Sequence, residues 1–308
     1  KYPVHGFLSS MEIPLQIGLV NTQADSILLL WPDNSYQVVN LTSGQPNIEF
    51  TYKPGLPAFN YKVLTDRLPN TTRAFTDITG KTGIKYKHIE NPFIEFDREP
   101  LIPHMVSREG PALAIGDANG DGLEDVFIGS SKENKPAIYF QQPNGTFYQT
   151  GQPALEADSM FEETDACWVD ANKDGFVDLI LASGGNEYYG EDEHLTPRVF
   201  LNDGKGKFTK KSAAFDKLYL TASCVLPYDF TGDGYVDLFI GGRAVPWEYG
   251  QTPQSYLLEN DKSGGFKDVT SKYSQEIGKV GFVTSGRWFD MDKDGDMDLI
   301  ISLEWGGI

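Results

Sequence analysis

A single motif recurs four times in this 308-residue chain and limits the folds open to it. Its copies read DANGDGLEDVFIG, DANKDGFVDLILA, DFTGDGYVDLFIG and DMDKDGDMDLIIS, and they begin at Asp117, Asp170, Asp229 and Asp290. The intervals of 53, 59 and 61 residues suit a repeat of one four-stranded sheet with its loops, rather than a helical hairpin. The chain is therefore predicted to be an array of similar sheets.

Each copy of the motif runs into a short apolar segment, at residues 126–128, 179–181, 238–240 and 299–301. Continuous β-branched and aromatic residues are typical of a strand covered on both faces. A second element, a strand followed by a turn, closes at Phe147, Phe208 and Phe266, and the Asn-Gly and Asp-Gly pairs in the first two are hairpin signals. We predict an all-β fold, a β-propeller with its blades in residues 75–308. A β-sandwich would not predict a repeat of this length.

The motif itself carries the pattern of a calcium loop. Oxygen-bearing side chains fall at its first, third, fifth and ninth positions, and glycine at the sixth permits a sharp turn. Alternate side chains of a tight loop converge on one point, and with the seventh carbonyl they give the hard oxygen ligands that suit Ca²⁺. About four calcium sites are predicted, with these ligands: Asp117, Asn119, Asp121, Leu123 and Asp125; Asp170, Asn172, Asp174, Phe176 and Asp178; Asp229, Thr231, Asp233, Tyr235 and Asp237; Asp290, Asp292, Asp294, Asp296 and Asp298.

Other readings of the motif are weaker. An EF-hand needs glutamate at position twelve, which here holds Ile128, Leu181, Ile240 and Ile301. Mg²⁺ demands a smaller octahedron with retained waters, and soft metals lack thiolate or imidazole ligands. The remaining alternative is that these segments are acidic turns without a metal. Four copies in register favour calcium.

Composition excludes some functions. The net charge of −18 argues against nucleic-acid binding, which requires clustered basic residues. No apolar segment approaches the roughly 20 residues of a membrane helix, and no signal peptide is recognised within the chain. Cys167 and Cys224 are interpreted as buried strand residues rather than a disulfide.

The four motifs resemble the FG-GAP or VCBS repeat family, whose calcium loops line the blades of integrin α-subunit heads and of many bacterial surface proteins. The segments FTDITGKTGI at 75–84 and GPALAIGDANGDGLEDVFIG at 110–129 resemble bacterial relatives of cartilage acidic protein. The resemblance implies a seven-bladed propeller, of which about four blades are covered. Because the chain stops ten residues past Asp298, before the strands expected after the fourth loop, we expect the array to be truncated at its C-terminus. Residues 75–79 match 266–270 and predict an outer strand of a further blade.

Residues 1–55 resemble the small ASPIC/UnbV domain that accompanies this family. The resemblance rests on Ser9-Ser10, Leu15, Gly18-Leu19 and ADSILLLWPDN at 24–34; Gln16-Ile17, Val20 and Asn34 depart from its usual His-Phe, glycine and glycine. Without the family, residues 24–31 and 36–41 predict two strands joined by a turn at 32–35, which is a β-hairpin. Residues 56–74 are the predicted linker.

These features predict a calcium-binding, non-enzymatic binding scaffold. Calcium is abundant outside cells, which favours a secreted or cell-surface protein, and the resemblance implies a lipid-anchored component of the bacterial outer membrane associated with nutrient-import machinery. The expected partner is a protein or glycan at the cell surface. No catalytic residue is assigned, because His5, His88, His104 and His194 stand in no nucleophile or zinc motif.

Two alternatives remain open. One is a polysaccharide-active enzyme or glycan-binding protein on a propeller scaffold, and the other is a structural spacer. The acidic, aromatic segment at 185–193 is either a solvated loop or a binding loop for sugar or protein.

Overall fold

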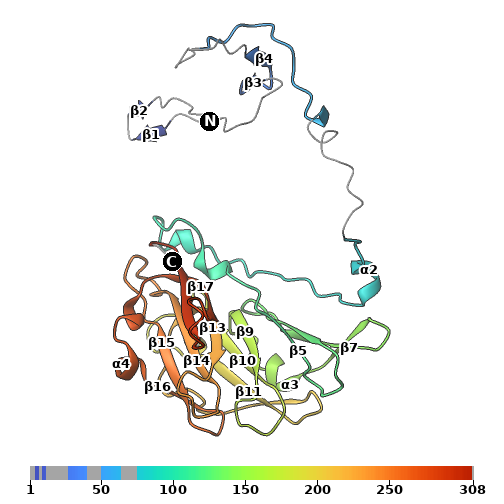
Figure 1. The fold of residues 1–308 in the computed structure, drawn as a ribbon, viewed down its shortest axis with the longest axis vertical. Coiled ribbons are helices and arrows are strands. Elements are labelled where there is room, and N and C mark those ends of the chain that lie inside the picture. Colours follow the sequence, from blue (N-terminus) through green and yellow to red (C-terminus); the bar gives the residue numbers. More distant parts are fainter. Residues whose placement is uncertain (1–3, 7–8, 12–26, 40–49, 64–74, 307–308) are drawn as a thin grey trace. The chain divides into compact units, whose positions relative to one another are not determined.

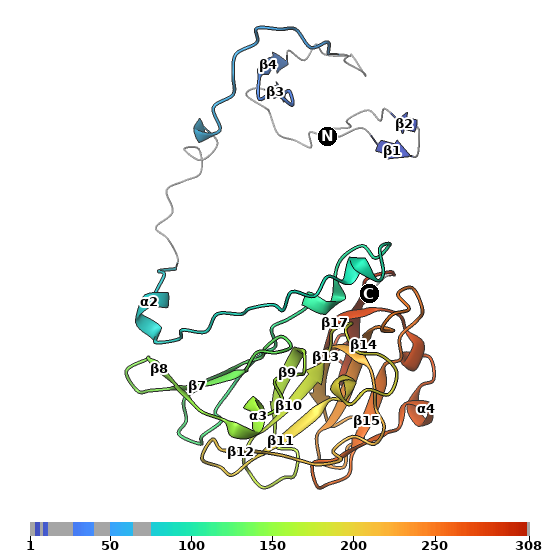
Figure 2. The ribbon, with the colours of Figure 1, turned by 180° about the vertical axis from the view of Figure 1, so that it is seen from behind.

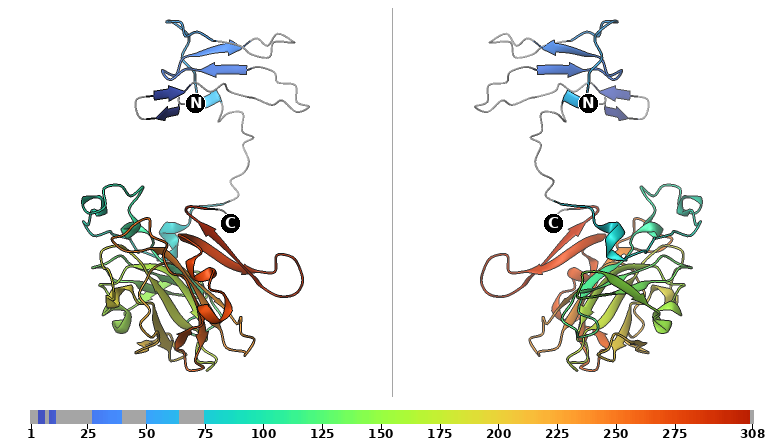
Figure 3. Two further views of the ribbon diagram at one scale, coloured as in Figure 1. Left: turned by 90° about the vertical axis from the view of Figure 1, so that its left-hand side faces the viewer. Right: turned by 90° about the vertical axis from the view of Figure 1, so that its right-hand side faces the viewer.

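The computed structural model describes residues 4–6, 9–11, 27–39, 50–63 and 75–306, and the chain divides into two units, Lys1–Thr76 and Asp77–Ile308. The first unit contains two antiparallel hairpins, β1 (Val4–Gly6) with β2 (Ser9–Met11) and β3 (Ile27–Leu30) with β4 (Tyr36–Val39) (Figure 3). The second hairpin turns through Asn34 at a φ of 65°, a conformation that asparagine tolerates. The predicted hairpin is confirmed there, and residues 24–26 and 40–41 lie outside the described part. The proposed domain boundaries stay a prediction.

The second unit is an array of antiparallel sheets, which we call blades 1 to 4 (Figures 1 and 2). Each of the first three blades has four strands in sequence order. Blade 1 contains β5 (Leu113–Gly116), β6 (Asp125–Ile128), β7 (Ala137–Gln141) and β8 (Phe147–Thr150); blade 2 contains β9 (Glu163–Val169), β10 (Asp178–Ser183), β11 (Arg198–Asn202) and β12 (Phe208–Lys210); blade 3 contains β13 (Thr221–Tyr228), β14 (Asp237–Ala244), β15 (Tyr256–Asn260) and β16 (Phe266–Asp268); blade 4 contains β17 (Val283–Phe289) and β18 (Asp298–Leu303). The all-β array of blades is confirmed, whereas closure into seven blades stays a prediction.

Helices are short and lie between the strands. Within residues 75–306 they are α2 (Thr79–Thr82), α3 (Pro153–Glu156), α4 (Thr270–Tyr273) and the 3₁₀ turns η1 (Glu95–Asp97), η2 (Val106–Arg108), η3 (Glu193–Leu195) and η4 (Ile277–Lys279). Residues 75–78 form no strand, contrary to the predicted outer strand. An outer strand exists only by bonding to a neighbour, and no described strand lies beside these residues. The likeness to 266–270 holds instead for the helix, since α2 and α4 follow the two matching segments.

The core lies between adjacent blades. Leu179, Leu181 and Phe200 of blade 2 pack with Phe127 of blade 1, while Ile180 faces the apolar cluster shared with blade 3. Consecutive residues of β10 therefore enter different cores, and every residue of β10 and of β14 is buried. This explains why the segment after each motif is continuously apolar rather than alternating. Cys167 in β9 and Cys224 in β13 are both free thiols.

A crossing segment, residues 84–110, runs along one end of the blades and appears as the teal ribbon at their upper edge in Figures 1 and 2. Tyr86 Oη donates to the carbonyl of Gly129 beyond β6 (2.7 Å), and Glu99 accepts from the backbone of Tyr249 beyond β14 (3.0 Å). We call this end of the blades the crossing end. The other end, where each second strand begins, is the motif end.

Candidate calcium-binding loops

The four motifs form equivalent loops at the motif end. Loops 1 to 4 connect β5 to β6, β9 to β10, β13 to β14 and β17 to β18, and the ninth residue of each begins the second strand. The predicted ligands of each site therefore share one loop between two hydrogen-bonded strands. Whether these residues bind an ion stays a prediction that the local geometry can support.

The first aspartate organises each of the first three loops. In loop 1 the carboxylate of Asp117 accepts from the backbone N–H groups of Gly120 (2.8 Å), Asp121 (3.1 Å) and Gly122 (2.8 Å). Gly122 has a φ of 83°, which a side chain would strain. Asp170 and Asp229 accept in the same way from loops 2 and 3. The loop thus curls around one carboxylate, whose oxygens retain lone pairs for a cation.

Side chains within loops 1 to 3 contact one another. Asn119 Nδ2 donates to Asp121 Oδ2 (3.1 Å) in loop 1, and Asn172 Nδ2 donates to Asp174 Oδ2 (2.8 Å) in loop 2. In loop 3 the hydroxyl of Thr231 lies 3.4 Å from Asp229 Oδ1. These contacts hold the third position against the fifth or the first, and the convergence of these ligands on one Ca²⁺ ion stays a prediction.

The ninth aspartate has a second role that the sequence did not reveal. Asp125, Asp178 and Asp237 are 0% exposed. One carboxylate oxygen accepts from a backbone N–H at the start of the same loop (3.0 to 3.1 Å), and the other accepts from the last residue of the third strand (2.8 to 2.9 Å). Burial raises the pKa of Asp178 to about 6 and raises the pKa of Asp125 and Asp237 as well. This residue therefore ties the loop to the sheet.

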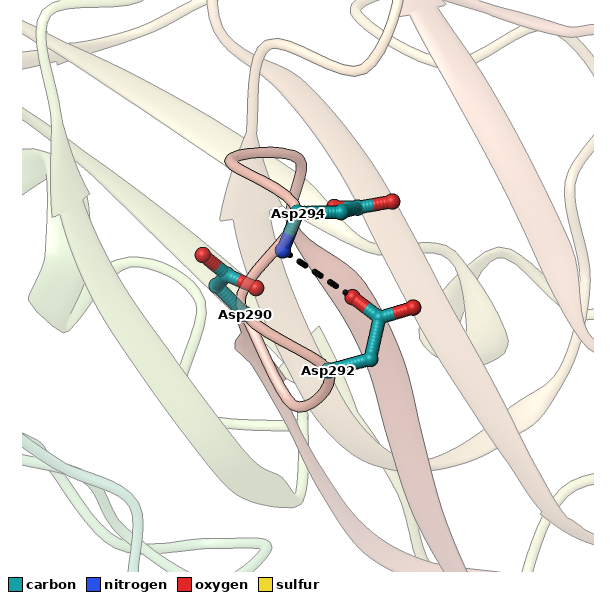
Figure 4. A group of neighbouring side chains, drawn as sticks. All are labelled: Asp290, Asp292 and Asp294. Carbon is teal, nitrogen blue, oxygen red and sulfur yellow. Dashed lines mark hydrogen bonds between the residues drawn. The ribbon is translucent and has the colours of Figure 1, made fainter.

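Loop 4 differs because its third residue is an aspartate. Among the described residues, Asp290, Asp292 and Asp294 are the one group of three acidic, histidine or cysteine side chains with one ligand atom each within 4.8 Å of one another (Figure 4). Asp290 Oδ1 is buried and has no hydrogen-bond partner. Three converging carboxylates repel one another unless a cation lies between them, so the residues of this loop fit Ca²⁺.

Two residues that the sequence reasoning missed connect neighbouring loops. Asn202 and Asn260 end the third strands of blades 2 and 3, and each side chain donates to a carbonyl of the preceding loop and to one of its own loop. The repeated Asn-Asp pair after an apolar strand, at 202–203 and 260–261, was the available signal.

Comparison with protein families agrees with this geometry. The profile described as FG-GAP-like repeat matches residues 117–181, 170–240 and 229–301. The chain belongs to the FG-GAP-like repeat family. An ASPIC and UnbV profile matches residues 1–56, so the resemblance of the N-terminal segment is confirmed. FG-GAP repeats typically bind Ca²⁺.

The similar proteins include integrin α subunits. Human integrin alpha-IIb is 28% identical over 158 residues, which cover 44% of this chain and 15% of that protein. Integrin alpha-4 of Xenopus laevis is 29% identical over 149 residues, covering 43% of this chain and 14% of that protein. A solved lectin from Agrocybe aegerita that recognises non-reducing terminal N-acetylglucosamine has 21% identity and a TM-score of 0.35, covering 54% of this chain and 40% of that one. The chain thus spans only a small part of the integrins that it matches.

Proposed function

We propose that this FG-GAP repeat protein is a calcium-dependent, non-enzymatic binding scaffold. Its motif end would hold Ca²⁺, and its crossing end would present the surface that meets a partner. The observation that carries the proposal is loop 4, where three carboxylates converge and the buried Asp290 Oδ1 has no partner. A bound Ca²⁺ would supply the positive charge that such a group lacks.

Each loop would bind the ion through residues already held in place. In loops 1 to 3 the first aspartate is fixed by the backbone N–H groups of its loop, and the ninth by the loop and the third strand, so few side chains need to be ordered on binding. Pre-ordered ligands reduce the entropy cost of binding. The bound ion would in turn connect the first and second strands of one blade and make that blade more rigid.

We place the protein outside the cell, at a bacterial outer membrane, as a lipid-anchored component associated with nutrient-import machinery. The support for an extracellular site is the abundance of calcium there, and the rest follows the resemblance of the chain to bacterial surface proteins. None of the helices that the structure describes is long and apolar enough to cross a membrane.

Glycan binding is the second candidate, and an exposed aromatic pair favours it. Tyr189 and Trp247, which are 58% and 42% exposed, stack at 4.2 Å with 17° between their planes. Trp247 has a φ of 68°, an unusual backbone conformation for a bulky residue that is often found at functional sites. The flat exposed ring of Tyr189 is suited to the apolar face of a sugar, and it stacks on a Trp247 ring that also carries Arg98 Cζ at 4.6 Å from its centroid. The segment 185–193 is only partly solvated, because Asn186 is buried while Tyr189 is exposed.

The calcium proposal is tested by counting ions and by thermal unfolding. The chain is dialysed against Ca²⁺, Mg²⁺ or EDTA, and bound metal is measured by mass spectrometry. We expect about four bound Ca²⁺ ions and a melting temperature that rises with Ca²⁺ more than with equal Mg²⁺. Asp294→Ala should remove one ion. An EDTA-treated protein that melts at the same temperature as the calcium-treated one would contradict the proposal.

The choice between scaffold, glycan binder and enzyme requires a separate assay. Soluble oligosaccharides are incubated with the calcium-loaded chain, and both binding and product release are measured. Binding that Trp247→Ala abolishes and the control Tyr148→Ala retains would support the glycan candidate, since Tyr148 is an exposed aromatic residue on the outer strand of blade 1. Turnover of any glycan would contradict the non-enzymatic proposal.

A further inference from the structure

We propose that Asn202 and Asn260 couple the calcium loops of consecutive blades, so that an ion bound in one loop raises the affinity of the next. This inference rests on the calcium binding proposed above. It assigns a positioning role to two residues outside the motifs. The argument follows an unbroken series of hydrogen bonds from loop 1 to loop 3.

The series begins at the ninth residue of loop 1. Asp125 Oδ2 accepts from the backbone N–H of Ala118 (3.0 Å), and the carbonyl of Ala118 accepts from Asn202 Nδ2 (2.7 Å). The backbone N–H of Asn202 donates to Asp178 Oδ1 (2.8 Å), the ninth residue of loop 2. One alanine residue, through its N–H and its carbonyl, and one asparagine therefore connect predicted ligands of two different blades.

The same series continues into blade 3. Asp178 Oδ2 accepts from the backbone N–H of Ala171 (3.0 Å), and the carbonyl of Ala171 accepts from Asn260 Nδ2 (2.9 Å). The backbone N–H of Asn260 then donates to Asp237 Oδ1 (2.9 Å) in loop 3. Two independent copies of one arrangement make a chance contact a poor explanation.

Both asparagines are buried and fully engaged. Asn202 also donates to the carbonyl of Val177 (2.8 Å), and its Oδ1 accepts from the backbone N–H groups of Gly204 (3.1 Å) and Gly206 (3.2 Å). Asn260 likewise donates to the carbonyl of Val236 (3.0 Å). Because a buried amide that loses one partner leaves others unsatisfied, a shift of Ala118 in loop 1 must disturb the position of Val177 in loop 2.

This geometry gives the coupling a physical route. An ion in loop 1 holds the ligands on either side of Ala118 and thereby fixes the carbonyl that Asn202 contacts. Asn202 then holds Val177 and Asp178, the two residues that follow the seventh residue of loop 2, Phe176. Part of the ordering that the second ion needs has then already occurred, and this is positive cooperativity. The coupling is reciprocal, so an ion in loop 2 must favour loop 1 by the same factor.

The test measures each loop separately in the full chain. Hydrogen–deuterium exchange is followed by mass spectrometry during a calcium titration, and the midpoint of protection is obtained for loops 1, 2 and 3. Asp121→Ala disables loop 1 without touching the series of hydrogen bonds. We expect this variant to raise the midpoint of loop 2 on the order of fivefold. In an Asn202→Ala background, Asp121→Ala should leave the midpoint of loop 2 unchanged.

Gln141→Ala is the matched control. Gln141 occupies the position of Asn202 in blade 1, where only its backbone N–H bonds to Asp125 (2.8 Å), and that bond survives the substitution. The coupling of loop 2 to loop 1 should persist in this variant. If Asn202→Ala does not fold, Asn202→Asp keeps the side-chain volume and removes the two N–H donors, and Asn260→Ala repeats the test between loops 2 and 3.

Three outcomes overturn the inference or its basis. If loop 2 keeps its midpoint when loop 1 is disabled in the parent chain, the loops are independent and the inference is wrong. If the shift persists undiminished in the Asn202→Ala background, the asparagine does not carry it and the inference is also wrong. If calcium protects no loop in the parent chain, the proposed function itself fails, and this result is distinct from the other two.

Discussion

The two ends of the blades compensate the negative charge of their acidic residues in different ways. At the crossing end, carboxylates pair with cations of the chain: Glu109 with Arg243 (2.7 Å), Glu187 with Lys132 (2.5 Å) and Glu163 with Arg198 (3.1 Å). At the motif end, the four loops bond their aspartates to backbone N–H groups, and Lys262 with Asp233 (3.0 Å) is the one ion pair among the described loop aspartates. The crossing end therefore carries its own counterions, whereas the motif end leaves that role to an added cation.

The largest expected effect is at the crossing end. The side chain of Arg243 is 5% exposed and pairs with Glu109 and Glu304. Arg243→Ala would leave both carboxylates without their cation, so we expect the free energy of unfolding to fall by about 3 to 5 kcal/mol. Urea unfolding at saturating calcium measures this. A loss below about 1 kcal/mol would show that the crossing end does not depend on its internal ion pairs.

The pH dependence of the crossing end should follow Glu162. This residue is 6% exposed, and burial, followed by the nearby Glu90 and Glu187, raises its pKa from 4.5 to about 8, although the backbone N–H of Lys132 opposes the shift. The folded chain then keeps a proton that the unfolded chain releases above pH 4.5. Stability must therefore fall as the pH rises from about 5 to 8, and level off above the folded pKa.

The expected loss over that interval is at most about 4 kcal/mol, since each pH unit between the two pKa values corresponds to about 1.4 kcal/mol. Glu162→Gln should reduce this slope in urea unfolding at saturating calcium, and part of it should remain because burial also raises the pKa of Glu163 and Asp165. Glu156→Gln is the control, because its pairing with Lys135 lowers the pKa of Glu156 instead, and the slope should remain. A slope that Glu162→Gln leaves intact would assign the titration to another group.

Loop 4 offers a way to change the charge of the motif end. Asp292→Asn gives its third position the residue type that loops 1 and 2 already have in Asn119 and Asn172. With one carboxylate fewer, calcium affinity should fall by about tenfold, which is about 1.4 kcal/mol. The metal-free chain should become more stable by about 1 kcal/mol or less, because repulsion within the triad decreases.

Asn119→Asp in loop 1 is the reciprocal change. It should raise the affinity of that loop and lower the stability of the metal-free chain. Calorimetric titration and urea unfolding in EDTA measure the two quantities. If both substitutions change affinity in the same direction, carboxylate number does not control the loops.

The sequence predicted the motif end better than the crossing end for a physical reason. A calcium loop is local, so the spacing of Asp117, Asp121 and Asp125 within nine residues was enough to place them in one loop, and their joint binding of an ion stays a prediction. The apolar runs after each motif likewise predicted the buried strands. The pairing of Glu109 with Arg243 joins residues 134 positions apart, and no local pattern indicates it. Asn202 and Asn260 are intermediate between these two cases. Their repetition is visible in the sequence, whereas their hydrogen bonds to the neighbouring blade are not.

The outer strand predicted at 75–79 failed for a related reason. The two similar segments are each followed by a short helix, α2 or α4, which the sequence analysis did not predict. A strand, however, depends on a neighbour, and that partner is not specified by the segment itself. The two segments thus share a short helix at their C-terminal end but do not share a strand pairing.

The smallest expected effect concerns the one ion pair of the motif end. Lys262 is 57% exposed along its side chain, and its Nζ lies 3.0 Å from Asp233 Oδ2, a predicted calcium ligand. An exposed pair of this kind contributes little to stability because solvent screens it, so Lys262→Ala should barely change urea unfolding in EDTA. The same substitution removes a cation that competes with the metal, and calcium affinity at loop 3 should rise about twofold.

Lys272→Ala, which breaks the equally exposed pair with Glu259 away from the loop ligands, should leave that affinity unchanged. A fall in affinity for Lys262→Ala would mean that the lysine positions Asp233 for the ion, and the motif end would then depend on its own cation as the crossing end does.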